Sequence, residues 1–184
     1  MTDNIAVMLC GQNSGDVSTV EEFNLLAVEL KRRLPGHDLE SGFLGAVGLD
    51  IQDGLETLAA RDAKKIICIP GVLFPPERIT KDLSAEIDKF SRAHAGLELV
   101  LSRELSMDSR LLAVARDRIE QVEQEASNHI QREETLLMVV GPGSDDSKAN
   151  SDVAKFTRLL WEGMGFGWAV NSQSFSPNRE LRSK

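Results

Sequence analysis

The chain has only two cysteines, and it lacks any long run of apolar residues. Its longest apolar stretch, at 135–140, is far shorter than the roughly 20 residues of a membrane-spanning helix. The first four residues are polar and acidic, so we expect no signal peptide. Cys10 and Cys68 lie in separate apolar segments without a neighbouring ligand. This favours two buried thiols in a reducing cytoplasm, with a redox or metal-binding pair as the alternative.

Positively charged residues are also fewer than negatively charged ones. The chain has 21 Lys and Arg residues against 29 Asp and Glu residues, which gives a net charge of −8. A general nucleic-acid-binding protein needs a basic surface that displaces counterions from phosphates, so nucleic acid is not an expected partner. The hydrophobic content of 41% and the charged content of 27% are ordinary for a globular protein. A length of 184 residues suits one domain, or one domain with part of another.

What the sequence contains is a regular alternation of short apolar runs and longer amphipathic segments. The apolar runs predict strands at 5–10, 38–44, 64–69 and 97–101. The segments with helical spacing predict helices at 18–34, 50–61, 79–93 and 108–133. This alternation predicts an α/β fold with a parallel open sheet flanked by helices on both faces.

The pattern begins again after residue 134. A strand at 136–140 is followed by glycine, serine and aspartate residues that lie 130 positions after similar ones, at 11 and 141, 14 and 144, and 16 and 146. These matches favour an internal duplication, with chance as the alternative. We therefore predict a complete domain at 1–133, a partial second repeat at 134–172 (strand, helix, strand) and a disordered polar tail at 173–184. A half-copy has too few strands to bury both faces, so it should dock on the first domain or on another chain.

Two loops follow predicted strands at the edge where ligands gather in open parallel sheets. The first, at 11–17, enters a helix whose amides could receive an anion. It lacks the lysine and the glycine spacing of nucleotide-binding loops. A structural turn capped by Ser14, Asp16 or Ser18 is an equally good interpretation.

The second loop, at 70–82, is richer in chemistry. Its 73–76 stretch is an apolar lip stiffened by two prolines, and Arg78 and Lys81 follow at the start of the next helix. This pattern predicts a carboxylate-binding rim above an apolar floor, or else a rigid connection with a solvated first turn. His37, His94 and His129 share no spacing typical of a metal site, so surface or capping roles are expected.

Together the two loops resemble the sirohydrochlorin cobaltochelatase family, the CbiX-like class II chelatases, in its long form of two tandem halves. Family members begin with a strand and Gly-His-Gly-Ser-Arg-Asp, where this chain has Gly-Gln-Asn-Ser-Gly-Asp at 11–16. Their third strand runs into Pro-hydrophobic-Leu-Phe, Gly-His and a helix containing Lys and Asp. The corresponding stretch here is 70–82. Similarity at 32–36, 42–44, 55–69 and 150–168 extends the resemblance over about residues 5–172.

The resemblance implies insertion of a divalent metal, typically cobalt, into an eight-carboxylate tetrapyrrole precursor of cobalamin. Cobalt would be a substrate, and no permanently bound cofactor is implied. Two family histidines hold the metal and help to remove the pyrrole protons, which suits the affinity of neutral imidazole for cobalt, nickel or iron. Gln12 and Arg78 stand at those catalytic positions, and Gly45 replaces a glutamate that often follows the second strand. Glutamine is a poor metal ligand and arginine stays protonated, so no metal-ligating residue is predicted.

Three functions therefore stay open. The first is a working chelatase with a degraded site, in which Glu77 or Asp16 serves as metal ligand and base. The second is a non-catalytic tetrapyrrole binder or partner subunit, and the third is an inactive truncated paralogue. The expected partners are a small-molecule tetrapyrrole and a second copy or partner chain that completes the second half, but no membrane. The predicted substrate-binding residues are Asn13, Ser14, Phe74, Arg78 and Lys81.

Overall fold

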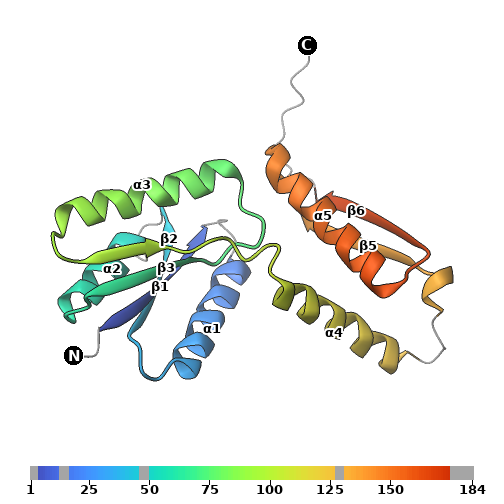
Figure 1. Ribbon diagram of the computed structural model, residues 1–184, viewed down its shortest axis with the longest axis horizontal. Coiled ribbons are helices and arrows are strands. Elements are labelled where there is room, and N and C mark those ends of the chain that lie inside the picture. Colours follow the sequence, from blue (N-terminus) through green and yellow to red (C-terminus); the bar gives the residue numbers. More distant parts are fainter. Residues whose placement is uncertain (1–3, 13–16, 46–49, 127–130, 175–184) are drawn as a thin grey trace, which may run out of the picture. The chain divides into compact units, whose positions relative to one another are not determined.

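A computed structural model of the chain describes residues 4–12, 17–45, 50–126 and 131–174 (Figure 1). The chain divides into two compact units, Met1–Leu105 (unit 1) and Ser106–Lys184 (unit 2). Within the described residues, every helix is too short or too polar to cross a membrane.

Unit 1 is built on a sheet of four parallel strands. These are β1 (Ile5–Gln12), β2 (Leu39–Leu44), β3 (Lys65–Pro70) and β4 (Glu98–Leu101), in the order β2-β1-β3-β4. The central strands β1 and β3 are apolar runs, as expected where helices cover both faces of a parallel sheet. The predicted α/β fold with a parallel sheet flanked by helices is confirmed.

Alternate residues of β1 point to opposite faces, and each face has its own core. Val7 and Leu9 pack against Phe23 and Ala27 of α1 (Val17–Arg33). Met8 and its neighbours on the other face pack against α2 (Ile51–Ala60) and α3 (Glu77–Ala93). Figure 1 shows α1 on one side of the sheet and α2 and α3 on the other.

The carboxyl ends of β1, β2 and β3 lie at the same edge of the sheet. Gln12 is the register partner of Leu44 on β2, and Cys10 is the register partner of Pro70 on β3. The loops after β1 and β3 therefore start side by side. β1 runs two residues further than the apolar pattern predicts, because Gly11 pairs with Phe43 before the strand ends.

Unit 2 contains a small parallel sheet with helices on one face. It comprises α4 (Ser109–Glu125), the 3-10 turn η1 (Arg132–Glu134), β5 (Leu136–Pro142), α5 (Ser147–Met164) and β6 (Trp168–Ser174). In its core, Leu137 and Val139 of β5 pack with α5 and α4. The α4 residues in this core are Leu112, Ala115 and Ile119. The Asp146 side chain caps α5 by accepting a hydrogen bond from the Ala149 amide at 2.9 Å.

Three boundaries differ from the sequence prediction. The helix predicted at 108–133 ends at Glu125, because Ala126 has an extended backbone. The compact units divide after Leu105 rather than after residue 133, because α4 packs with α5. The last strand runs to Ser174, into the segment predicted as tail, and residues 175–184 lie outside the described residues.

Candidate functional site

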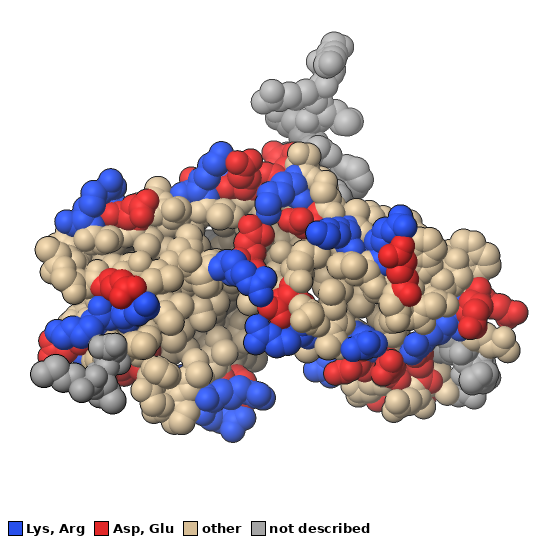
Figure 2. Space-filling model, viewed as in Figure 1, with Lys and Arg blue, Asp and Glu red and all other residues tan. Residues whose placement is uncertain are grey.

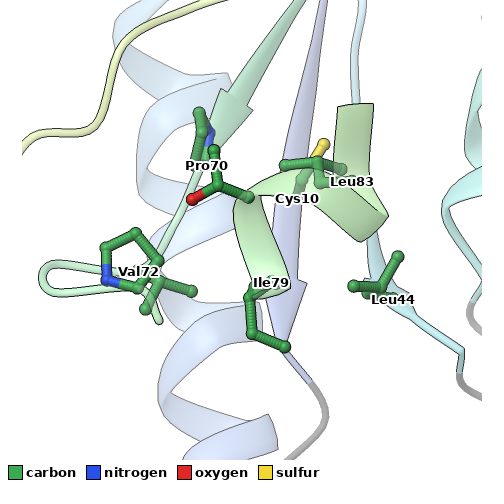
Figure 3. Close-up of a pocket in the computed structure, with 9 residues that line it drawn as sticks. Cys10, Leu44, Pro70, Val72, Ile79 and Leu83 are labelled. Carbon is green, nitrogen blue, oxygen red and sulfur yellow. The ribbon is translucent and has the colours of Figure 1, made fainter. Parts of the chain in front are cut away.

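A pocket opens at the carboxyl edge of the unit 1 sheet. It encloses about 330 Å³, part of it open to solvent. Its walls come from the ends of β1, β2 and β3, the loop after β3, and the first two turns of α3. In Figure 3, Ile79 and Leu83 of α3 face the strand ends that carry Cys10 and Leu44. The lining residues are Cys10, Gly11, Leu44, Pro70, Val72, Pro75, Ile79, Thr80 and Leu83.

The floor of this pocket is apolar and chemically inert. Cys10 is a buried free thiol and donates a hydrogen bond to the Met8 carbonyl at 3.7 Å. A hydrogen bond with Cys68, together with burial, raises the pKa of the Cys10 thiol far above its usual range. A thiol that stays protonated is a poor nucleophile and metal ligand. The prediction of buried thiols at both cysteines is confirmed.

The loop after β3 is held against the sheet by a close backbone approach. The Gly71 amide donates to the Cys10 carbonyl at 2.7 Å, and a Cβ on Gly71 would lie 2.8 Å from Phe23 Cε2. Pro75 is buried and Phe74 is half-buried, while Leu73 is exposed. The predicted apolar lip therefore has a buried side that lines the pocket and an exposed tip.

The two cations predicted for the rim lie in the first turns of α3, and both are paired along the helix. Arg78 donates to Asp82 at 3.0 Å, and Lys81 lies 2.7 Å from Glu77. The hydrogen bond that Lys81 donates to Glu77 raises the pKa of Lys81, which keeps this side chain protonated. Both cations are largely exposed, at 74% and 73%. The sequence prediction of a positive rim missed this local neutralisation, although the i, i+4 spacing of opposite charges indicates it.

Gln12 and Arg78 each adjoin a residue that lines the pocket. Gln12 is half-buried and follows Gly11, while Arg78 precedes Ile79. Neither is itself a lining residue, so their facing each other across the cleft stays a prediction. Asn13, Ser14 and Asp16 lie outside the described residues.

Gly11 has a packing role at this edge. A Cβ on Gly11 would lie 2.8 Å from Phe43 Cδ1 and 2.9 Å from Phe23 Cε2, and these two rings contact each other at a tilt of 45°, with centroids 4.6 Å apart. Only glycine fits between β1 and the rings. Close packing therefore accounts for this glycine without an anion.

Metal-ligating side chains do not gather at the pocket. Among the described residues, no group of three or more His, Cys, Asp and Glu side chains could hold a metal ion. His37 contacts the Ile5 carbonyl at 2.9 Å, and His94 stacks on Phe90 and lies 3.3 Å from Glu56. These are structural roles, as predicted for both, and His129 lies outside the described residues.

Thr80 and Leu44 are site residues that the sequence prediction missed. Thr80 is the one lining residue with a hydroxyl group. Thr80 lies two residues after Arg78 on the same helix. The helical spacing could have indicated it as a site residue, since residues 79, 80 and 83 lie on adjoining faces of α3.

The surface visible in Figure 2 carries both signs of charge. Lysine and arginine side chains alternate with aspartate and glutamate side chains over the described residues on this face, without a continuous basic stripe.

Comparison with known proteins gives a consistent set of relatives. The sequence model of the CbiX family matches residues 6–122. A sirohydrochlorin cobaltochelatase of Priestia megaterium is 29% identical over 126 residues, covering 67% of this chain and 40% of the relative. A sirohydrochlorin ferrochelatase of the same organism is 24% identical over 118 residues, covering 64% of this chain and 42% of the relative. This chain thus matches less than half the length of either curated relative.

Solved structures share the fold at low sequence identity. The sirohydrochlorin chelatase SirB of Bacillus subtilis subspecies spizizenii, in complex with cobalt, matches with a TM-score of 0.74 and 16% identity, covering 92% of this chain and 67% of that one. SirB from Bacillus subtilis with Fe3+ matches with a TM-score of 0.79 and 18% identity, covering 95% and 68%. A cobalamin biosynthesis CbiX protein of Marinobacter aquaeolei VT8 matches with a TM-score of 0.58 and 16% identity, covering 66% of this chain and 99% of that one.

Proposed function

Since the chain belongs to the CbiX family, we propose that it binds a sirohydrochlorin-type tetrapyrrole at the carboxyl edge of the unit 1 sheet and acts as a metal chelatase there. In this reaction a divalent metal ion replaces two pyrrole protons, which pass to a base. The family match over residues 6–122, which includes the whole pocket, is the observation that carries this proposal. Cobalt is the metal that we favour, because it is named for a curated relative.

The pocket has the chemistry to hold one edge of a macrocycle. Its empty space of about 330 Å³ includes open solvent, so the pocket is shallow and most of a tetrapyrrole would remain outside it. Val72, Pro75 and Ile79 would contact the apolar ring edge. The peripheral carboxylates would meet Arg78 and Lys81 once these cations leave their helix partners, and such surface ion pairs contribute little stability.

The site is poorly equipped to accept the pyrrole protons and to hold the metal ion. By resemblance, Gln12 and Arg78 stand where the family has histidines, and arginine is neither a ligand nor a base at neutral pH. Glu77 directly precedes Arg78 and is the first residue of α3. We therefore expect slow metal insertion, with Glu77 taking protons and presenting the metal.

A non-catalytic tetrapyrrole binder is the second candidate. The absence of a three-residue ligand group among the described residues favours it. In that function the same apolar pocket and α3 cations bind the macrocycle, and a partner or another chain supplies the chemistry.

We also propose that residues 134–172, which carry β5, α5 and the start of β6, are a partial second copy of the β1, α1 and β2 segment, as the 130-residue offset predicts. Gly11 packs on Phe23 of α1, and at matching positions Gly141 would place a Cβ 3.1 Å from Val153 Cγ1 of α5. Both strands are followed by a helix and a parallel partner strand. An inactive paralogue is the alternative to both the chelatase and the binder, and the same assays test it.

The decisive experiment separates binding from insertion. The purified chain is titrated with sirohydrochlorin, and the absorbance shift is recorded first without metal and then with cobalt, nickel or ferrous iron. Chelatase activity predicts metallo-tetrapyrrole formation above a protein-free blank. A shift without insertion supports the binder, and no shift at micromolar protein excludes both proposals.

Two variants sharpen this assay. Val72→Asp places a charge in the pocket wall and should weaken binding at least tenfold. Lys89→Glu, on a more distant and exposed turn of α3, is the control and should change binding less than twofold. Equal loss in both variants would mean that the ligand follows net charge rather than the pocket.

A further inference from the structure

One face of the β5–β6 sheet in unit 2 is apolar and uncovered. Its exposed side chains come from alternate positions that the parallel register places on one side of the sheet, since Leu136 pairs with Trp168 and Met138 with Val170. Trp168 is 61% exposed and Met138 is 58% exposed. The members of this face are Leu136, Met138, Val140, Trp168 and Val170, and it is called the bare face below.

The same chain shows how such a sheet is normally completed. In unit 1, the Met8 side of β1 is covered by α2 and α3, while its Leu9 side is covered by α1. In unit 2, Leu137 and Val139 are covered by α5 and α4, but the opposite side of β5 has no helix among the described residues. A parallel sheet normally has both faces buried, and the described residues of unit 2 supply no layer over the bare face.

Charge and composition favour a second copy as the occupant. The face carries no Asp, Glu, Lys or Arg between Leu136 and Val140 or between Trp168 and Ser172, although the chain has a net charge of −8. Two copies can therefore meet here without direct repulsion between like charges. Tryptophan and methionine are also enriched at interfaces, where homodimers are more apolar than other complexes.

We propose that two copies of the chain pack bare face against bare face about a two-fold axis. The two sheets then stack as layers about 10 Å apart, and Trp168 of each copy covers the Met138 and Val140 positions of the other. An isologous contact of this kind closes at a dimer. Five side chains supply less than the roughly 800 Å² per partner of a standard interface, so the dimer dissociates at micromolar concentrations.

Sedimentation equilibrium of the full chain from 1 to 200 µM, a range of the order expected for this interface, tests the proposal. We expect a monomer–dimer equilibrium, accompanied by a blue shift of tryptophan emission as the concentration rises. Trp168 causes this shift, because Trp161 already donates to the Phe166 carbonyl within its own unit at 2.6 Å. A chain that stays monomeric throughout this range overturns the proposal.

Substitutions then locate the interface. Met138→Glu should weaken the dimer at least tenfold, and the milder Met138→Gln should weaken it to a lesser degree while keeping the side-chain length. Leu25→Glu, at a 69% exposed position of α1 in unit 1, is the matched control and should leave the equilibrium unchanged. Pairing of free strand edges leaves Met138 in water, so a dimer that persists in Met138→Glu contradicts face-to-face packing. Circular dichroism confirms that each variant is folded before its monomer–dimer equilibrium is measured.

Discussion

Arg78 donates a hydrogen bond to Asp82, one turn further along α3, at 3.0 Å. With the Glu77–Lys81 pair beside it, the first turns of this helix carry two positive and two negative charges that cancel locally. An anionic ligand at the pocket rim must therefore compete with carboxylates of the helix itself. Because of this competition, removing one of these carboxylates should change the affinity for the tetrapyrrole measurably.

Asp82→Asn should strengthen binding of a carboxylate-rich tetrapyrrole. The variant frees the Arg78 guanidinium and removes one negative charge beside it, and we expect an affinity gain of about three- to tenfold at low ionic strength. Absorbance titration in 20 mM and 300 mM salt, on either side of physiological ionic strength, measures the effect, which should shrink at the higher concentration. Asp88→Asn changes the same net charge further along α3 and should gain less than twofold. Equal gains in both variants would contradict a specific role for Asp82.

Restoring two histidines tests the assignment of the catalytic positions. In Gln12→His combined with Arg78→His, two neutral imidazoles replace a weak ligand and a repelling cation, so we expect cobalt insertion at least tenfold faster than in the unchanged chain. Formation of cobalt-tetrapyrrole is followed by absorbance, and the two single variants are the controls. Binding without faster insertion in the double variant would mean that the two side chains do not share one cleft.

The sequence was sufficient for the sheet and for the two loops at its edge, but not for the detail of the site. The continuous apolar run at the start of Ile5–Gln12 indicates a strand that is buried on both faces, so the strand and its covering helices follow from local pattern alone. The i, i+4 spacing of Arg78 and Asp82 indicates their ion pair, but the side-chain rotamers that form it do not follow from the sequence. That a half-copy leaves a sheet face uncovered was expected from the sequence. Which face it is was not, because the apolar run at 136–140 has the same pattern on both sides of the strand. The placement of Gln12 opposite Arg78 stays a prediction.

Gly11→Ala should destabilise unit 1 without touching any charged group. A Cβ there would lie 2.8 Å from Phe43 and 2.9 Å from Phe23, so the rings or the strand must shift, and overpacking of this kind costs about 1–3 kcal/mol. Urea unfolding followed by circular dichroism measures this loss, because both tryptophans lie in unit 2 and do not report on unit 1. Gly36→Ala, which meets nothing within 4 Å, should stay within about 0.5 kcal/mol. A neutral Gly11→Ala variant would show that this edge is loosely packed.

Arg132 should control the acid stability of unit 2. Its guanidinium donates to Glu123 at 2.8 Å and to the Met164 carbonyl at 3.3 Å, and it lies over the Phe166 ring. The hydrogen bond from Arg132 lowers the pKa of Glu123 below its usual value. A carboxyl group with a lowered native pKa contributes stability above its unfolded pKa of about 4.3, and this stability is lost as the pH falls through the native pKa.

Arg132→Ala should therefore cost about 1–2 kcal/mol at pH 7, and its free energy of unfolding should depend less steeply on pH below about 4.5. Tryptophan emission during urea unfolding reports on this unit, because Trp161 is hydrogen-bonded to the Phe166 carbonyl. Arg118→Ala removes an exposed arginine of α4 that donates only to Gln121 at 3.3 Å, so it should keep both the stability and the acid dependence of the unchanged chain. If the two variants lose stability in parallel as the pH falls, the acid sensitivity of unit 2 arises from net charge and not from the Arg132–Glu123 pair.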